Sequence, residues 1–154
     1  MCKDVEIIST NVIPDVPSVN KLLKIIKSHD KQDVNQFING DDRIILVDYL
    51  RNFFDEKKLN KLADVCPINL VQNVDMHNDT RFLKQMGYSP KVYFLVLETT
   101  VKRSYVDSPH YNVLICGSSH IDLEYNTLYA FNANKYHGVM VDKKLLGVTL
   151  FFRK

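Results

Sequence analysis

The sequence predicts an α+β fold that is mainly β: an antiparallel sandwich or jelly roll preceded by a few helices. Two observations support this prediction. Before Pro67, apolar residues recur at the spacing of amphipathic helices. After Pro67, short runs rich in β-branched and aromatic residues alternate with turn signals. Many short strands at such spacing are typical of a sandwich or jelly roll, and the preceding helices are expected to pack against one sheet.

Length and composition indicate one domain over residues 1–154, with a mostly helical support region at 1–66 and a β core at 67–154. A chain of 154 residues buries a core without disulfides, and its net charge of +2 is too small to indicate a dedicated nucleic-acid binder. The three cysteines are odd in number and show no CxxC spacing, so we expect reduced thiols. The charged N-terminus predicts no signal peptide, and no apolar run reaches the roughly 18 residues of a membrane helix. A cytoplasmic protein without a membrane anchor is therefore expected.

The first part of the chain contains one expected edge strand, at residues 5–8, and several helical patterns. Ser18 is a good N-cap for a helix over the apolar positions of 19–26. A second short helix is predicted around 34–38, because Asn39-Gly40 is a stop signal. Residues 44–54 predict a third helix, although 43–47 are also compatible with a strand. A helical pattern continues from Leu59 towards Pro67.

The second part contains a series of short predicted strands. They are bounded by turn residues such as Gly117-Ser118-Ser119 and Asn132-Ala133-Asn134. The predicted strands cover residues 92–100, 111–116, 121–125, 127–131, 136–141 and 145–152.

Two segments of this part contain residues that are typical of a metal site. In a strand or at a strand end, His77 and Asp79 would point to the same side, because side chains two apart share a face. His137 opens a later predicted strand and would supply a third ligand. Two histidines and one carboxylate on one face of an octahedron leave three positions open, an arrangement that suits non-haem Fe(II).

With these residues the sequence resembles the Fe(II)- and 2-oxoglutarate-dependent oxygenases, in particular the prolyl-hydroxylase-like branch. The resemblance rests on the H-x-D of His77 and Asp79, on the distal His137 in an F-x-x-x-x-x-H-G-V context, and on a basic residue before a last apolar strand. It covers residues 67–154. It implies a double-stranded β-helix core with N-terminal supporting helices, and His77, Asp79 and His137 as ligands of Fe(II).

The resemblance also implies a binding site for 2-oxoglutarate. Lys144, seven residues after His137, matches the family's basic partner of the distal carboxylate, with Lys143 as an alternative. Tyr93, fourteen residues after Asp79, matches a tyrosine that touches the same carboxylate in the prolyl-hydroxylase-like branch. The activity implied is an O₂-dependent hydroxylation, or oxidative demethylation, of a C–H bond. A peptidyl substrate is favoured, with a nucleobase or a small molecule as alternatives.

Other interpretations of the sequence stay open at this stage. His120-Ile121-Asp122 is a second H-x-D, and His110-Tyr111-Asn112 is a weaker candidate pair. Residues 101–105 are a candidate substrate loop. A jelly roll that binds a partner without turnover, and a cupin-type metal enzyme that uses no 2-oxoglutarate, are rival functions, and the second would leave Lys144 without a role.

Overall fold

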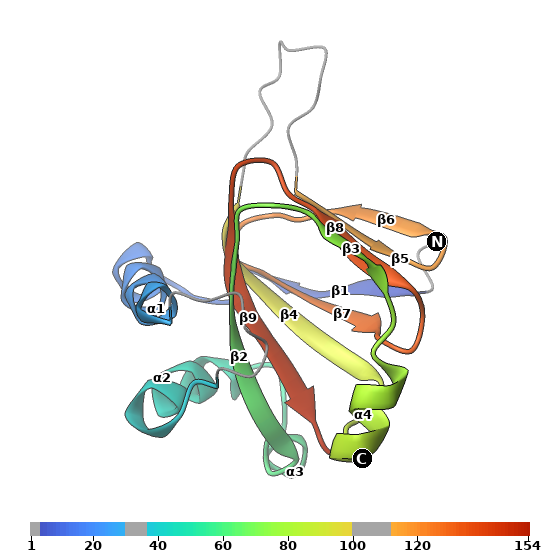
Figure 1. The fold of residues 1–154 in the computed structure, drawn as a ribbon. Helices are drawn as coiled ribbons and strands as arrows, with labels where there is room; N and C mark the ends of the chain where they lie inside the picture. The colour runs from blue at the N-terminus through green and yellow to red at the C-terminus, as the bar shows by residue number, and fades with distance from the viewer. Residues whose placement is uncertain (1–3, 30–36, 100–111) are drawn as a thin grey trace.

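Two antiparallel β-sheets face each other in the computed structural model, which describes residues 4–29, 37–99 and 112–154 (Figure 1). The first sheet has the order β1-β7-β4-β9-β2 and the second has the order β3-β8-β5-β6. Every paired strand in both sheets is antiparallel to its neighbour.

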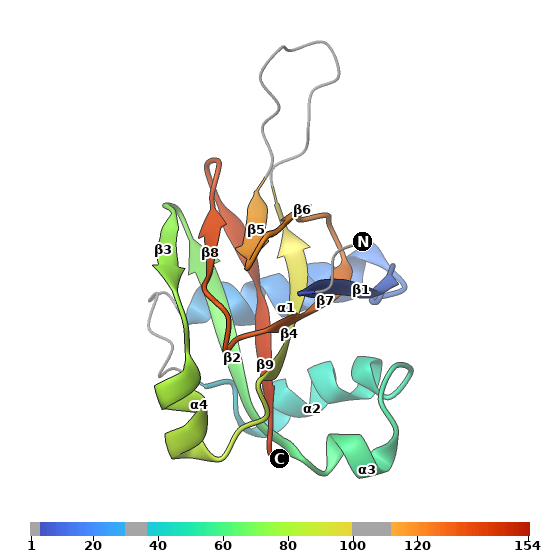
Figure 2. The ribbon, with the colours of Figure 1, turned by 90° about the vertical axis from the view of Figure 1, so that its right-hand side faces the viewer.

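The strands of the two sheets are interleaved along the chain, which is the connectivity of a jelly roll. The chain leaves β2 in the first sheet for β3 in the second, returns for β4, and later crosses between sheets again at β7, β8 and β9 (Figure 2). The first sheet consists of β1 (Val5–Thr10), β2 (Leu62–Leu70), β4 (Lys91–Glu98), β7 (Thr127–Asn132) and β9 (Leu145–Phe152). The second sheet consists of β3 (Val74–His77), β5 (Val113–Cys116), β6 (Ser119–Asp122) and β8 (His137–Met140).

The first sheet is buried on both faces, and strand alternation assigns each residue to one of them. Tyr93, Leu95 and Leu97 of β4 belong to the core that the first sheet forms with the helices. Phe94 and Val96 belong to the core between the two sheets. This alternation decides which side chains of β4 face the second sheet and which face the helices.

Two helices cover the outer face of the first sheet (Figure 1). In α1 (Val16–Ser28), Val19, Leu22 and Ile26 are buried, at the spacing of one helical face. The second helix is α2 (Gly40–Leu50), which buries Leu46 and Leu50. Two short helices complete the fold, α3 (Glu56–Leu59) and α4 (Thr80–Met86), and α4 follows β3 directly.

The predicted fold class is confirmed, and most predicted strands occur close to their expected positions. The strand at 5–8 forms an edge of the first sheet as β1, and residues 43–47 are helical, within α2. The prediction of a helical pattern up to Pro67 was wrong, because β2 begins at Leu62 and pairs along its length with β9. The helix expected around 34–38 falls largely outside the described residues, and residues 37–39 are not helical. None of the helices within the described ranges is long and apolar enough to cross a membrane.

Candidate metal centre

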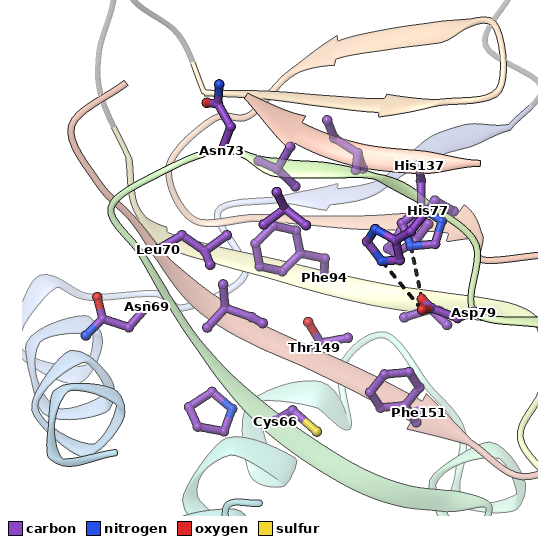
Figure 3. Close-up of a pocket in the computed structure, with 17 residues that line it drawn as sticks. Cys66, Asn69, Leu70, Asn73, His77, Asp79, Phe94, His137, Thr149 and Phe151 are labelled. Atoms are coloured by element: carbon purple, nitrogen blue, oxygen red, sulfur yellow. Dashed lines mark ion pairs between the residues drawn. The ribbon is translucent and has the colours of Figure 1, made fainter. Parts of the chain in front are cut away.

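The three residues predicted as metal ligands lie together where β3 meets β8 (Figure 3). His77 ends β3 and His137 begins β8, and the two are direct partners across the antiparallel pair. Gly138 lets the strands approach, since a Cβ there would lie 2.7 Å from the carbonyl oxygen of Val74. Asp79 comes two residues after β3, at the N-cap of α4. The carboxylate therefore reaches the imidazoles from a strand-to-helix junction, and not from the strand itself.

The distances fit three donors around one ion. The Asp79 carboxylate lies 3.0 Å from His137 Nε2 and 3.5 Å from His77 Nε2. One ligand atom from each of the three residues lies within 4.8 Å of the others. Donor atoms about 2.1 Å from a common ion and at right angles to each other lie about 3 Å apart. The two carboxylate distances are close to this value, and the limit of 4.8 Å for the whole set exceeds it, so the three side chains would move towards each other to bind one divalent ion.

Both imidazoles are held with Nε2 towards the centre by backbone carbonyl groups. His77 Nδ1 lies 2.7 Å from the carbonyl oxygen of Asp75, and His137 Nδ1 lies 2.8 Å from that of Lys135. A carbonyl oxygen only accepts, so each Nδ1 carries the proton and donates it. In the neutral ring, Nε2 then keeps a lone pair for a metal. This hydrogen bond on the second ring nitrogen is the usual outer support of metal-binding histidines.

The turn between β7 and β8 positions two of the three candidate ligands, Asp79 and His137. Asn132 Oδ1 accepts a hydrogen bond from the amide of Asn134, as is common for asparagine in turns. In the same turn, the carbonyl oxygen of Ala133 accepts a hydrogen bond from the amide of Asp79, at 2.9 Å. Because Lys135 supports His137, one turn positions both the carboxylate segment and the distal imidazole.

Asp79 stands at a helix N-cap without capping the helix. An N-cap aspartate normally accepts a hydrogen bond from an amide of the first turn. Asp15 does this in α1, where its carboxylate accepts from the Ser18 amide at 2.8 Å. The Asp79 carboxylate makes no such bond and faces the two imidazoles instead. The Asp79 carboxylate therefore does not stabilise the N-terminus of α4 and occupies a position typical of a metal ligand.

The environment of His137 opposes and favours its charged form at once. Burial of the imidazole would lower its pKa, but the hydrogen bonds to Asp79 and to the Lys135 carbonyl, and the charge of Asp79, raise the pKa above its ordinary value. The His137 side chain is 6% exposed, whereas those of Asp79 and His77 are 28% and 43% exposed. The centre is therefore open to solvent on the His77 side and closed on the His137 side.

A cavity of about 380 Å³ extends from this centre into the space between the two sheets (Figure 3). The three candidate ligands lie at one end, away from Leu70 and Asn73. Most of the wall is apolar. The lining residues are Cys66, Pro67, Ile68, Asn69, Leu70, Asn73, Val74, His77, Asp79, Val92, Phe94, Leu114, Phe131, His137, Val139, Thr149 and Phe151.

The structure places Tyr93 on the other face of the first sheet. Its ring packs against Phe54 and Phe152 at centroid distances of 4.9 and 5.3 Å, and Lys58 lies 5.5 Å above the ring. The β4 side chains that line the cavity are its neighbours Val92 and Phe94. The spacing from Asp79 matched the family, but strand alternation turns this tyrosine towards the helices. A 2-oxoglutarate contact from Tyr93 does not fit this position.

Lys144 also lies away from the cavity. It immediately precedes β9, its side chain is 52% exposed, and its ammonium group forms a 2.6 Å ion pair with Glu98. Lys143 occupies the preceding turn position with a left-handed φ of 69° and does not line the cavity either. Neither lysine is placed to contact a carboxylate inside the cavity, so the predicted cosubstrate role does not fit either position.

The competing motifs do not form a second cluster in the described part of the chain. His120 and Asp122 lie on β6, an edge strand of the second sheet, and both are exposed. Asn112 is buried. Its side chain donates hydrogen bonds to the Thr99 hydroxyl and to the carbonyl of Lys144, and it accepts one from the amide of Asp142. His110, Tyr111 and the candidate loop 101–105 lie outside the described residues.

Sequence reasoning missed the residues that shape the cavity. Phe94 and Thr149 belong to predicted strands, but only the observed register shows that they face inwards. The supporting carbonyl groups of Asp75 and Lys135 carry no sequence signal, because any residue type supplies them. The turn signal at Asn132-Ala133-Asn134 was visible, and its position just before His137 was the available clue.

Comparison with solved structures supports the fold, whereas comparison of the sequence with family models and curated proteins gives no match. No protein-family model matches the sequence, and no curated protein matches it. The crystal structure of a Pseudomonas putida prolyl-4-hydroxylase is similar, with a TM-score of 0.60 and 16% identity over 98% of this chain and 88% of that one. The nickel complex of ThoJ, a non-heme monooxygenase, gives a TM-score of 0.48 and 8% identity over 90% of this chain and 66% of that one. At this level of identity, the chain shares its jelly-roll fold with the prolyl-4-hydroxylase.

Proposed function

We propose that this protein is a non-haem iron(II) oxygenase in which His77, Asp79 and His137 hold the metal. The observation that supports this most directly is the convergence of two backbone-oriented Nε2 atoms and one carboxylate at the end of a cavity. Two imidazoles and one carboxylate leave positions open for other ligands and suit Fe(II). When bound, the iron would supply the activation of O₂ that oxidation of a C–H bond requires.

The residues of the chain have separate tasks in this proposal. Asp79 provides the negative charge that offsets part of the metal's charge, and the two histidines provide neutral lone pairs. Metal binding at His137 requires loss of the Nε2 proton that Asp79 favours in the metal-free protein. Phe131 and Phe151 belong to the apolar wall and exclude water from the inner side of the centre.

The opening on the His77 side favours a substrate presented from outside the molecule. His77 is 43% exposed and Asp79 is 28% exposed, so a residue on a flexible segment of another chain can approach the centre. This supports the peptidyl substrate expected from the resemblance, and the reaction proposed is hydroxylation or oxidative demethylation. The similar solved structure from Pseudomonas putida is named as a prolyl-4-hydroxylase.

The metal centre and the predicted binding site for 2-oxoglutarate differ in how their residues are placed. The fold and the three candidate ligands favour a 2-oxo acid as cosubstrate. The two side chains expected to bind its distal carboxylate, Tyr93 and Lys144, do not line the cavity. The function that these residues support is therefore that of an iron oxygenase, without commitment to 2-oxoglutarate as the cosubstrate.

An oxygen-uptake experiment tests the proposed activity. Protein loaded anaerobically with one equivalent of Fe(II) is mixed with aerated buffer that contains a 2-oxo acid, and dissolved O₂ is followed with an electrode. We expect uptake well above that of free Fe(II), and Asp79→Ala should reduce it to the level of free Fe(II), because one ligand and its charge are lost.

The second H-x-D provides a matched control for this experiment. Asp122→Ala removes the same group from the exposed β6 pair and should leave the uptake unchanged. Equal uptake by wild type and Asp79→Ala would refute the proposed function. Metal binding without any uptake would favour the rival interpretation, a jelly roll that binds a partner without turnover.

A further inference from the structure

The walls of the cavity are almost free of charge. Among the described residues that line it, Asp79 is the one with a formal charge at neutral pH, apart from histidines, and there is no lysine or arginine. The Cys66 thiol adds no charge, since burial raises its pKa to about 12. Uncharged polar groups in the wall include the hydroxyl of Thr149 on β9 and the side-chain amides of Asn69 and Asn73 (Figure 3).

The inward face of β9 explains why no cation enters from the last strand. Thr149 and Phe151 line the cavity, and Leu145 packs in the core between the sheets. Gly147 cannot be replaced by a longer residue without rearrangement, because a Cβ there would clash with the backbone carbonyl oxygen of Leu95 and would lie 2.7 Å from the ring of Phe94. Phe94 therefore occupies the space beside Gly147. Thr149 is the position on β9 at which a basic residue would face the cavity.

Charge balance distinguishes two kinds of ligand for such a cavity. A divalent metal with Asp79 leaves one positive charge at the centre, given neutral histidines. A 2-oxo acid with one carboxylate neutralises this charge. A dianion such as 2-oxoglutarate leaves one negative charge, and the described lining residues include no lysine or arginine to pair with its second carboxylate. Burial of a carboxylate without a cationic partner is unfavourable, and the neutral donors of Asn69, Asn73 and Thr149 would supply no charge to balance it.

We infer that the cavity beside the metal centre holds the uncharged, largely apolar end of a 2-oxo acid whose carboxylate end binds the metal. A monocarboxylate 2-oxo acid is then preferred over 2-oxoglutarate. The inference rests on the proposed metal centre and specifies the class of ligand that it accepts. A volume of about 380 Å³ lies within the range of small-molecule sites, and the apolar wall supplies hydrophobic contacts to a methyl or alkyl end.

The test compares two probes that differ in one group. 2-Oxopentanoate has the same metal-binding 2-oxo acid as 2-oxoglutarate, with a methyl group in place of the distal carboxylate. Each is titrated calorimetrically into the whole protein loaded with Co(II), and the visible spectrum of Co(II) reports that the metal stays bound. We expect 2-oxopentanoate to bind at least about tenfold more tightly than 2-oxoglutarate.

A pair of variants at Thr149 supplies the matched control. Thr149→Lys introduces a cation at the inward position of β9 and should shift the preference towards 2-oxoglutarate by about tenfold or more. Thr149→Met adds similar length without charge, so any change that it causes in cavity space should affect both probes alike and should not favour 2-oxoglutarate. Thermal unfolding shows whether each variant is folded, and the wild-type comparison decides the matter without them.

The outcomes separate this inference from the proposed function. Tighter or equal binding of 2-oxoglutarate by the wild type overturns the inference and leaves the metal centre in place. Absence of binding by both probes to Co(II)-loaded protein overturns it as well. Failure of the protein to bind Co(II) overturns the proposed function, and the inference with it.

Discussion

Asp79 occupies a position in which two uses of one carboxylate compete. As an N-cap residue it would stabilise α4, yet its carboxylate faces His77 and His137 and makes no cap hydrogen bond. Residues that give up a local stabilising contact for an arrangement of ionisable groups are typical of functional sites. The comparison with Asp15, which does cap its helix, makes this difference measurable.

In metal-free protein, the loss of stability on replacing each aspartate by alanine should depend on pH for Asp79 and be independent of pH for Asp15. The pKa of His137 is raised, so its bond to Asp79 stabilises the fold fully below the ordinary value of 6.5 and is lost as the pH rises through the raised pKa. Asp79→Ala should therefore destabilise the protein at about pH 6 and have little effect at about pH 9. Asp15→Ala should cost about 1 kcal/mol at both values.

Urea unfolding in the presence of a chelator measures both variants. If Asp79→Ala were as destabilising at high pH as at low pH, the carboxylate would be acting as a structural group, and not mainly as the partner of a protonated His137.

At the residue scale, the sequence indicated which residues form the metal site, but it did not indicate to which face of a strand each side chain points. The H-x-D of His77 and Asp79, the context of His137 and the family resemblance together predicted that the three residues meet, and the structure brings them together. Tyr93 also matched by spacing, but it faces the helices because a strand turns successive residues to opposite faces. A register that is wrong by one residue reverses every side chain, and the sequence did not fix that register.

At the scale of the elements, ion pairs connect α1, β4 and the turn between β8 and β9. They give Lys144 a structural role that needs no cosubstrate. Glu98 at the end of β4 pairs with Lys144 at 2.6 Å and with Lys27 of α1 at 3.5 Å. Burial would raise the pKa of Glu98, but the hydrogen bonds and charges of the two lysines outweigh it and hold the pKa below its ordinary value. Lys144 thus has a structural partner outside the cavity.

This link should be visible as a pH dependence of stability. A lowered carboxyl pKa gives stability that is present above the ordinary value of 4.5 and is lost as the pH falls through the lowered one. Lys144→Ala should reduce this contribution, by about 0.5 kcal/mol at neutral pH because the ammonium is half exposed. Chemical unfolding between neutral and acidic pH measures the change.

Lys143→Ala is the control, since no ion pair of Lys143 occurs in the described part of the chain. Ligand affinity should be the same in both lysine variants and the wild type. A loss of 2-oxo acid affinity in Lys144→Ala alone would return this residue to the site.

The elements themselves were predicted unevenly. The strands after Pro67 were recognisable because β-branched and aromatic runs ended at clear turn signals. The segment from Leu62 has a helical pattern in the sequence but forms β2, because short apolar runs do not distinguish a buried strand from a helix. Helix α4 was not predicted, since seven residues are too few to show a helical period.

For the whole molecule, the jelly roll explains how residues far apart in the sequence form one centre. Strands β3 and β8 are neighbours in the second sheet, although sixty positions separate the paired His77 and His137. The first sheet, supported from outside by α1 and α2, provides the opposite wall of the cavity. The fold class followed from the pattern of strands, whereas the apolar character of the cavity depended on tertiary register and could not be predicted.

X-ray absorption spectroscopy of the protein loaded anaerobically with one equivalent of Fe(II) tests the metal centre most directly. We predict a spectrum with scattering from two imidazoles and one carboxylate among light-atom ligands. This scattering from imidazole should disappear in the double variant His77→Ala/His137→Ala and persist in His120→Ala. An iron spectrum without imidazole scattering in the wild type, or one that is the same in the double variant, would contradict the proposed centre.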